Sequence, residues 1–388
     1  MKKLKRIFSL FLATTLLLSF ASCQKAGTEL SQLMIIQGIG IDAINNGYRV
    51  TVEILNNEQS GTPSGDGSSE NKTKIYTAEA QSVSAALRTL TSKSGNLPLF
   101  AHNRVIVIGE GAANQKLSDI LDFFLRNYDS RASQLVCVAK NSDAEKIIRA
   151  KLLNDTVKSE ILENMLLESH RQSLIPRVRV VDAINILNTP TAVLCLPAVT
   201  VQKNGENEDF KLDGCALYGH DETFSMYMTT GDAEGLAFLT DTVEKGFLTA
   251  ELPNGEKAGF VINKSKTRYE ISEKNGVLHY NLKINISCDI DEVSGAEYFS
   301  TDDDFFEVVK SSVAKAVIKR AENSLVVLKG NHGGDALRYG KRLMLLKPEL
   351  YNSVKDNWDD VFKSAVTTVT VKVTVRRIGE ETFYSKKQ

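Results

Sequence analysis

The chain alternates short apolar runs with segments whose apolar residues recur every three or four positions. Residues 104–108 and 135–139 are β-branched apolar runs of the kind that buried strands show. Residues 82–92 instead place their apolar side chains on one face of a helix. We expect further helices to begin at Ser118 and just after Ser142, which would cap the second of them. This strand–helix rhythm predicts an α/β N-terminal region.

Two hairpins are predicted where alternating segments flank Asn-Gly pairs. Residues 33–55 read as two strands around the pair at 46–47, and residues 269–290 read as two strands around the pair at 275–276. An Asn-Gly pair tolerates the positive φ angles of a tight turn. Both segments are therefore expected to form antiparallel sheet.

The last third of the chain is predicted to contain a long helix followed by a half-buried strand. The helix has one apolar stripe, formed by Phe306, Val309, Val313, Val317 and Ala321. Ser300 and Thr301 precede Asp303 and Asp304 at capping-box distance. Four valines at alternate positions from 369 to 375 are separated by polar residues, which is typical of a strand with one buried face.

Changes in these patterns predict an α+β or α/β protein of three domains, with mixed sheets flanked by helices. The expected segments are a signal peptide at 1–22, an N-terminal α/β domain at 23–201, a small middle domain at 202–265 and a C-terminal α+β domain at 266–388. The stretch 56–74 is rich in Gly, Ser and polar residues and is expected to be a surface loop.

The first 23 residues predict export and a lipid anchor. Four cations come before a mostly apolar run at 7–21, and Cys23 stands where an ordinary signal peptide would be cleaved. Cleavage before Cys23 would leave a diacylglyceryl-modified cysteine at the new N-terminus. An uncleaved membrane span is disfavoured because the apolar run is short and interrupted by Ser and Thr. Ordinary secretion is the remaining alternative.

Composition indicates a folded body and argues against nucleic-acid binding. The 388 residues are 42% hydrophobic and 24% charged, which is typical of globular chains. Loss of the leader removes four of the 47 Lys and Arg residues and leaves 43 against 48 acidic residues, a net charge of −5. The mature chain has no basic block of the kind that binds nucleic acid.

Four cysteines besides Cys23 remain, namely Cys137, Cys195, Cys215 and Cys288. They could form two disulfides outside the cytosol, but their spacing does not require it. We expect four free and mostly buried thiols, because Cys137 and Cys288 lie inside apolar strand-like runs. No C-x-x-C pair exists that would suggest a zinc site.

Motifs that resemble catalytic or cofactor sites fail on their context. The glycines at 38–43 fit a dinucleotide fingerprint, but a second strand follows where the helix should begin. The segment 334–341 has the wrong length and an Arg in place of the Ser or Thr of a phosphate loop. Residues 332–334 resemble an esterase oxyanion loop without its nucleophile turn. The acidic run 302–304 suits a helix start. We expect no enzyme, no cofactor and no metal.

Several of these stretches, taken in order, resemble the Ger(x)C family of spore germination lipoproteins. The matching stretches are the leader with Cys23, GIGID at 38–42, HNRVIVIGEG at 102–111, LDFFLRNYDSR at 121–131, Leu196-Pro197, GCALY at 214–218, the stretch 335–340, Trp358 and the closing valine strand. One departure is Gln24-Lys25, where the family often has Trp-Asp after the lipid-bearing Cys.

The resemblance implies a non-catalytic C-subunit of a nutrient germinant receptor. Such a subunit would be lipid-anchored to the outer face of the spore inner membrane and would assemble with integral-membrane A-type and B-type subunits. Two other classes remain: a substrate-binding lipoprotein of a transporter, which should show two similar lobes, and an extracytoplasmic hydrolase, which needs a nucleophile with a base.

A charged cluster follows the helix expected at 118–127. Arg126, Asp129 and Arg131 stand close together in the sequence after two phenylalanines. One interpretation is structural: an Arg–Asp network would fix the loop between helix and strand. The other is a polar contact with a partner subunit, which charged groups at an interface would orient.

Overall fold

The computed structural model describes residues 32–56, 72–153, 156–253, 255–293 and 303–376. The leader with Cys23, most of the polar loop expected at 56–74, and the expected cap at Ser300 and Thr301 lie outside these residues. None of the helices in the described ranges is both long enough and apolar enough to cross a bilayer.

The N-terminal part is built on a nine-stranded mixed sheet with the order β3-β2-β1-β5-β6-β7-β8-β9, and β4 pairs with β1. Strands β1, β5, β6 and β7 are mutually parallel, and the outer strands are antiparallel. The bounds are β1 Leu33–Ile44, β2 Gly47–Leu55, β3 Thr73–Ala80, β4 Leu97–Leu99, β5 Val105–Ile108, β6 Leu135–Ala139, β7 Cys195–Asn204, β8 Asn207–Tyr218 and β9 Phe224–Met228.

Helices cover both faces of this sheet. The helices are α2 Val83–Ser94, α3 Glu110–Ala113, α4 Leu117–Arg126, α5 Ala144–Ile148, α6 Lys158–Arg171 and α7 Val180–Leu187. Ile106 and Ile108 of β5 pack in the core with α2, α4 and α7, whereas Val105 and Val107 pack with α5 and α6 on the opposite face. Because successive side chains of a strand point to opposite faces, an apolar run such as β5 is buried on both.

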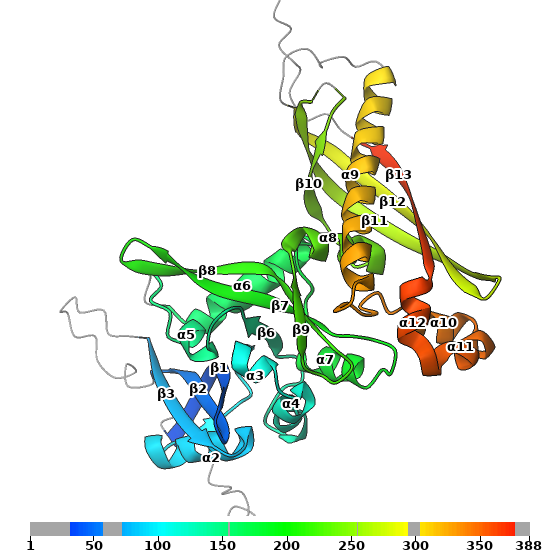
Figure 1. Ribbon diagram of the computed structural model, residues 1–388. Helices are drawn as coiled ribbons and strands as arrows, with labels where there is room; N and C mark the ends of the chain where they lie inside the picture. The colour runs from blue at the N-terminus through cyan, green and yellow to red at the C-terminus, as the bar shows by residue number, and fades with distance from the viewer. Residues whose placement is uncertain (1–31, 57–71, 154–155, 254, 294–302, 377–388) are drawn as a thin grey trace, which may run out of the picture.

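The C-terminal part contains a four-stranded sheet with the order β10-β11-β12-β13. Its strands are β10 Gly246–Glu251, β11 Lys257–Lys274, β12 Val277–Val293 and β13 Val366–Val375. Its helices are α8 Thr230–Thr240, α9 Asp303–Lys329, α10 Tyr339–Leu346, α11 Pro348–Val354 and α12 Trp358–Ser364. The long helix α9 runs along one face of this sheet (Figure 1).

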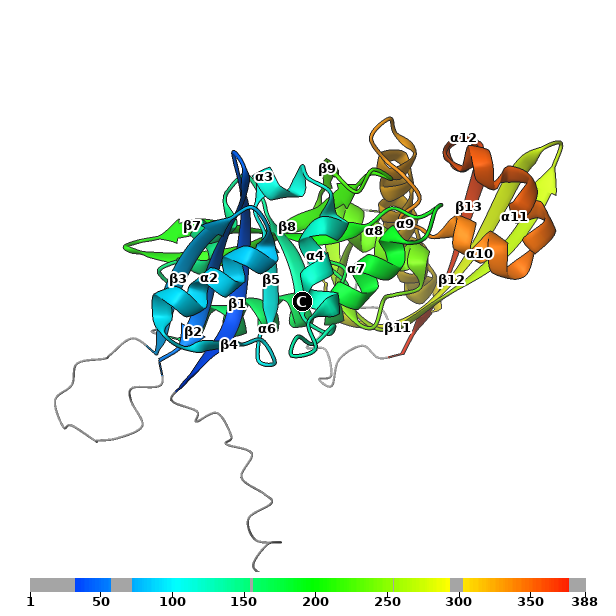
Figure 2. The ribbon, with the colours of Figure 1, turned by 90° about the horizontal axis from the view of Figure 1, so that it is seen from below.

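The two sheets share one hydrophobic cluster. Cys195 and Leu217 of the large sheet, Tyr280 of β12 and Trp358 of α12 belong to the same buried group. Helix α8 contributes to this cluster and to the core under α9. Seen from below, the molecule is elongated, with β2 and β3 toward one end and β12 and β13 toward the other (Figure 2).

Both hairpins, the helix at 82–92 and the closing strand are confirmed. Asn275 and Gly276 have positive φ angles of 53° and 80°, as the predicted turn requires. Ser82 caps α2 by accepting a hydrogen bond from the amide of Ala85. The alternation in β13 buries Val373 while the polar positions on either side are exposed.

Three details differ from the expectations. Helix α4 begins at Leu117 rather than Ser118. Phe305 rather than Phe306 belongs to the buried stripe of α9. Ser142 does not cap α5, because its hydroxyl donates to the carbonyl of Asp143 and the first amides of α5 bind a carboxylate on β1 instead.

The segment 202–265, predicted to be a middle domain, divides its strands between the two sheets. Strands β8 and β9 belong to the nine-stranded sheet, and β10 and the first half of β11 belong to the four-stranded sheet. Whether 202–265 folds as a separate unit stays a prediction.

Candidate functional site

The residues predicted to form a polar cluster lie at the end of α4 and in the loop before β6. Arg126 donates from Nε to both carboxylate oxygens of Asp122, at 2.7 and 2.8 Å, one turn earlier in the same helix. Within the described chain no ion pair joins Arg126, Asp129 and Arg131 to one another. The Arg–Asp network that would fix this loop is therefore not what the structure shows.

The end of α4 exposes large side chains. Tyr128 is 94% exposed, and the side chain of Arg126 is 79% exposed. Leu125 is also exposed, although its neighbours Phe123 and Phe124 pack inward. Exposed Tyr and Arg side chains are among the residue types that carry the binding energy of many protein interfaces. We call Leu125, Arg126, Tyr128, Asp129 and Arg131 the α4 surface.

A polar pocket of about 190 Å³ adjoins the α4 surface through Arg131. Arg104 crosses it and donates to Gln37 Oε1 at 3.1 Å and Glu163 Oε2 at 2.6 Å. The side-chain amide of Asn103 is buried and has no hydrogen-bond partner among the described residues. A buried amide without a partner in the protein needs water or another polar group at that position. The pocket therefore offers unsatisfied donors and acceptors next to an exposed surface.

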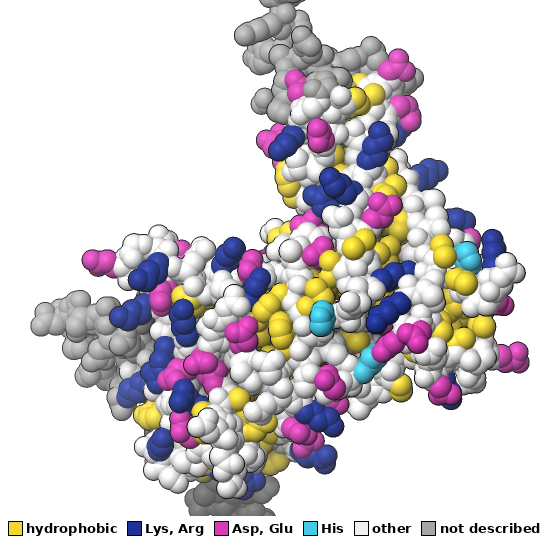
Figure 3. Space-filling model, in the orientation of Figure 1, with side chains coloured by type: hydrophobic (Ala, Val, Ile, Leu, Met, Phe, Trp, Pro, Cys, Tyr) yellow, Lys and Arg dark blue, Asp and Glu magenta, His cyan; other side chains and the backbone are white. Residues whose placement is uncertain are grey.

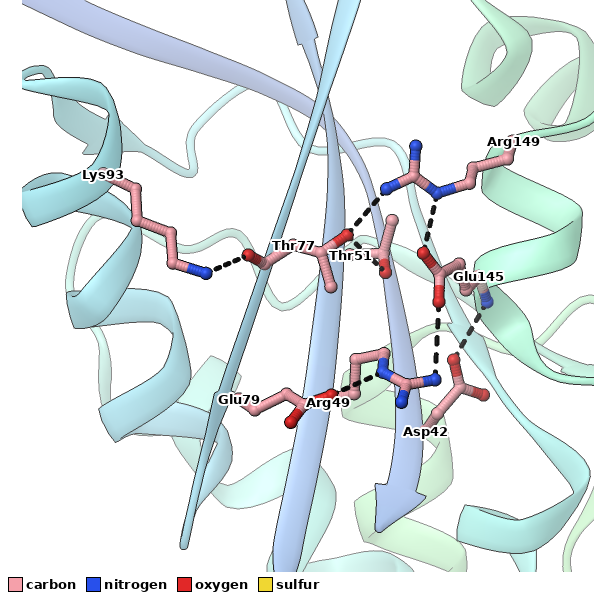
Figure 4. Close-up of polar contacts among 8 residues, drawn as sticks. All are labelled: Asp42, Arg49, Thr51, Thr77, Glu79, Lys93, Glu145 and Arg149. Atoms are coloured by element: carbon pink, nitrogen blue, oxygen red, sulfur yellow. Dashed lines mark hydrogen bonds and ion pairs between the residues drawn. The ribbon is translucent and has the colours of Figure 1, made fainter.

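The GIGID stretch positions a helix rather than a ligand. Asp42, on β1, accepts hydrogen bonds from the amides of Ala144 and Glu145 at 2.6 and 2.9 Å, so that its carboxylate caps the start of α5. Figure 4 shows the contact with Glu145. Burial, the largest effect on this group, raises the pKa of Asp42, although the two amide hydrogen bonds oppose it. A Cβ at Gly109 would lie 1.9 Å from Asp42 Oδ1, so only glycine leaves room for this contact.

A polar network surrounds this contact on the face of β1, β2 and β3 against which α5 packs. Arg49 bridges Glu79 at 2.8 Å and Glu145 at 3.4 Å, as Figure 4 shows. Arg149 binds Glu145 and the hydroxyl of Thr77. These contacts tie α5 to the first hairpin, and they leave no free nucleophile and base in this group.

A second carboxylate from the same hairpin caps α6. Glu53, on β2, is fully buried and accepts hydrogen bonds from the amides of Lys158 and Ser159 at 2.9 and 2.8 Å. The hydroxyl of Ser159 donates to the same carboxylate at 2.5 Å, and the Lys158 ammonium lies 3.7 Å away. A carboxylate at a helix N-terminus satisfies amides that have no partner within the helix and opposes the positive end of the helix dipole.

Asp335 plays the same part for α10 in the C-terminal region. Its carboxylate is fully buried and accepts hydrogen bonds from the amides of Tyr339 and Gly340 at 2.9 and 2.8 Å. The indole Nε1 of Trp358 donates to it at 3.2 Å. Burial raises the pKa of Asp335 to about 6, and the three hydrogen bonds moderate that shift. At Gly340 an added Cβ would lie 2.3 Å from Thr191 Oγ1.

The larger cavity, of about 450 Å³, lies between the α6–α7 connection, α8 and α10. Its lining includes His170, Arg179, Cys195, Leu236, Arg338 and Arg342. Arg342 is held over the ring of Tyr269, 3.7 Å from the ring centre, and donates to the Tyr269 hydroxyl at 3.0 Å and the Thr240 carbonyl at 3.2 Å. This fixed guanidinium braces the junction between α8, β11 and α10.

The structure places the remaining candidates separately. The glycines at 38–43 lie within β1, with no helix after them. Among the described residues no three His, Cys, Asp or Glu side chains lie close enough together to hold a metal ion. Cys23 lies outside the described residues, and its lipidation stays a prediction. Sequence reasoning missed Glu53 as a helix cap, and a lone acidic residue inside an apolar strand was the available signal.

Two family models match almost the whole described chain. The "Spore germination protein N-terminal domain" matches residues 27–201, and "Spore germination B3/ GerAC like, C-terminal" matches residues 213–379. The gap between the two matches, residues 202–212, covers the end of β7 and the first half of β8.

Curated relatives match over most of their length. "Spore germination protein KC" of Bacillus subtilis (strain 168) is 22% identical over 371 residues, which is 90% of this chain and 91% of that protein. "Spore germination protein B3" of the same organism is 20% identical over 89% of this chain and 91% of that protein. "Spore germination protein GerQC" of Bacillus cereus is 21% identical over 81% of this chain and 85% of that protein.

A solved structure has the same fold. The crystal structure of the GerBC protein superimposes with a TM-score of 0.58 at 19% identity and covers 87% of this chain and 96% of that one. The chain belongs to the Ger(x)C family, the C-subunit family of spore germinant receptors.

Proposed function

We propose that this chain is the membrane-tethered C-subunit of a nutrient germinant receptor and works by assembling with integral-membrane A-type and B-type subunits. The observation that carries the proposal is the match of both family domains, 27–201 and 213–379, in a single chain. The relatives described above match this chain over most of their length, and each is named as a spore germination protein. The polar side chains around Asp42 make structural contacts that hold helices in place. This structural use of polar groups suits an assembly subunit.

The tether in this proposal is a lipid on Cys23, which holds the body at the outer face of the spore inner membrane. Its support is the cationic and apolar leader that ends at Cys23. Two or three acyl chains on one protein hold it durably at a bilayer, whereas a single chain gives only marginal binding. Lys and Arg alternate with Asp and Glu on the face shown in Figure 3, so on that face the lipid, and not a basic surface, would supply the attraction.

The partner contact in this proposal is the α4 surface with the polar pocket beside it. Tyr128 and Arg126 supply exposed aromatic and guanidinium groups, and Asn103 supplies an amide that has no partner in the described chain. A partner loop that inserts a peptide or carboxylate group beside Arg131 would satisfy this amide and bury the tyrosine. Unsatisfied buried polar groups cost about 1–3 kcal/mol each, so their pairing favours assembly.

The proposal is tested in spores that carry either the native chain or Cys23→Ser. We expect the native chain in the inner-membrane fraction, an acylated N-terminal peptide by mass spectrometry, and integral-membrane subunits in the same affinity-purified complex. The Cys23→Ser chain should leave the membrane, and the response to nutrients should fall while a nutrient-independent trigger still works. An unmodified Cys23 would overturn the tether, and a lipidated chain that never co-purifies with membrane subunits would overturn the assembly role.

A further inference from the structure

Two of the four buried cysteines lie side by side on neighbouring strands. Cys195 opens β7 and Cys215 lies near the end of β8, and these strands are antiparallel. Cys195 is opposite Leu217, and Cys215 is opposite Pro197, so the two cysteines are diagonal neighbours on one face of the sheet. Their sulfur atoms are 2.8 Å apart. A disulfide has a bond length of about 2.05 Å, so the sulfurs need to approach by only about 0.8 Å.

The surroundings allow a reagent to reach one member of the pair. Cys195 lines the cavity of about 450 Å³ and is 7% exposed, whereas Cys215 behind it is fully buried. Both belong to the cluster that joins the two sheets. The hydrogen bond with Cys195, and after it burial, raise the pKa of the Cys215 thiol, so Cys215 is not the thiol that reacts first.

The other two cysteines have no such arrangement. Cys137, on β6, is fully buried, and burial raises its pKa far above the ordinary value for a thiol. Cys288, on β12, is also buried, and its pKa is raised to about 11. Neither has a second sulfur within hydrogen-bond distance among the described residues. They therefore serve as internal controls for cysteine chemistry in the same chain.

We propose that Cys195 and Cys215 are an oxidation site that forms an intramolecular disulfide when the protein meets a small organic disulfide. The thiolate of Cys195 attacks one sulfur of the reagent, and the other reagent sulfur leaves as a thiolate. The thiolate of Cys215 then attacks Cys195 in the mixed disulfide and displaces the second reagent thiolate. The two protein protons end on the two released thiols. Two protein thiols are oxidised, and one disulfide is reduced to two thiols.

The test uses the full chain, purified in detergent and fully reduced, with 2-hydroxyethyl disulfide as the oxidant. After oxidation the remaining thiols are alkylated, the chain is digested without reductant, and the peptides are identified by mass spectrometry. We expect one cross-linked peptide pair joining Cys195 and Cys215, two hydrogens lighter than the sum of the reduced peptides. Cys137 and Cys288 should be recovered alkylated once the chain is unfolded.

Variants decide between this pairing and general reactivity. Cys137→Ser and Cys288→Ser should leave the cross-link intact, and Cys215→Ser should stop the reaction at a mixed disulfide on Cys195. Recovery of Cys195 and Cys215 as free thiols in the native chain would overturn the proposal, as would a cross-link to Cys137 or Cys288.

Thermal unfolding supplies an independent readout that does not depend on peptide recovery. A cross-link between β7 and β8 restricts the unfolded chain, so oxidation should raise Tm by roughly 3 °C, and a reductant should reverse the change. Cys195→Ser replaces the sulfur with a group of similar size and should show no redox dependence of Tm. An identical Tm for the oxidised and reduced native chain would count against the pairing. All of these measurements are made without partner subunits, so their outcome is independent of the proposed receptor role.

Discussion

The indole Nε1 of Trp358 donates a hydrogen bond to Oδ2 of Asp335 at a distance of 3.2 Å, between residues 23 positions apart in the chain. The same carboxylate holds the first amides of α10, so a single buried group joins α10 and α12 to the core between the two sheets. Both residues belong to stretches that resemble the family. The contact therefore gives these stretches a structural role that can be measured.

Trp358 should report the protonation of Asp335. It is the only tryptophan of the chain, it is buried, and the neighbouring carboxyl has a pKa raised to about 6. We expect the intrinsic fluorescence of the folded chain to change with an inflection near pH 6, because a charged and a neutral carboxyl perturb the indole differently. Fluorescence titration checks this.

Two variants identify the group that titrates. Asp335→Asn should abolish the inflection. His220 lies near this carboxyl and pairs with Asp359, so His220→Gln is the control variant and should keep the inflection. If the inflection disappears in His220→Gln but stays in Asp335→Asn, it does not come from Asp335 and the prediction is wrong.

Replacement of Asp335 should also lower stability at pH 7. In Asp335→Asn the amide nitrogen cannot accept the hydrogen bonds that Gly340 and Trp358 donate to Oδ2. Two buried donors are then left without an acceptor, so the free energy of unfolding should fall by about 2–4 kcal/mol. Denaturant unfolding of the two chains at the same pH measures the difference.

The difference should depend on pH with a definite sign. The pKa of Asp335 is higher in the folded chain, about 6, than its ordinary value of 3.8, so the folded state binds this proton more tightly. Its contribution is fully present below pH 3.8 and is lost as pH rises through 6, a change of about 3 kcal/mol at most. The free energy of unfolding of Asp335→Asn lacks this dependence on pH. The difference in the free energy of unfolding between the native chain and Asp335→Asn should therefore narrow as pH rises from 4 to 7. A gap that stays constant over this range would contradict the raised pKa.

Glu53 should contribute more to the free energy of unfolding than an exposed carboxylate on the neighbouring strand. Glu53→Gln removes one of two acceptor oxygens and leaves the Lys158 ammonium without its partner, so we expect a loss of about 2–4 kcal/mol in the free energy of unfolding. Glu79→Gln is the matched control, because Glu79 on β3 is half exposed and pairs with Arg49 at the surface. That change should cost about 0.5 kcal/mol or less. Equal losses in the two variants would refute the capping role of Glu53.

The sequence predicted those elements that depend on the local spacing of apolar, polar and turn residues. The apolar face of α2, the Asn-Gly turn at 275–276 and the alternation in β13 follow from spacing that is visible in the sequence. The carboxylate caps could not be predicted from local spacing. Asp42 and Glu53 bind helix starts more than 100 residues later in the chain, and no local rule joins such positions. The same limit explains Ser142, which has the right residue type for a cap but loses that position to Asp42.

The sheet to which residues 202–228 belong could not be predicted from the sequence for a similar reason. Strands β8 and β9 join the large sheet through their antiparallel pairing with β7 and with each other, and no local pattern in the sequence names those partners. For the α4 surface, the pairing seen in the structure was not apparent in the sequence, and the partner contact stays a prediction. Arg126 pairs with Asp122, one turn earlier in α4, and not with the acidic residue of the loop that the structural interpretation would have used.

The last prediction concerns assembly through the α4 surface, and it rests on the proposed receptor role. Arg126→Ala and Tyr128→Ala should each leave the chain at the membrane and reduce co-purified membrane subunits about 5-fold or more, as loss of an interface anchor does. The free energy of unfolding should stay essentially unchanged, because the pair of Arg126 with Asp122 is exposed and screened by solvent. Quantitative affinity purification from spore membranes measures the first effect, and denaturant unfolding measures the second.

Arg171→Ala is the matched control for this experiment. Arg171 is also exposed and pairs within its own helix, with Glu168 of α6, but α6 covers the opposite face of the large sheet from α4. It should leave co-purification unchanged. Because the two arginines differ mainly in location, a loss confined to Arg126→Ala and Tyr128→Ala locates the contact at the end of α4. Normal recovery of the partners with both of these variants would remove the α4 surface from the assembly, while the Cys23 experiment would still decide the tether.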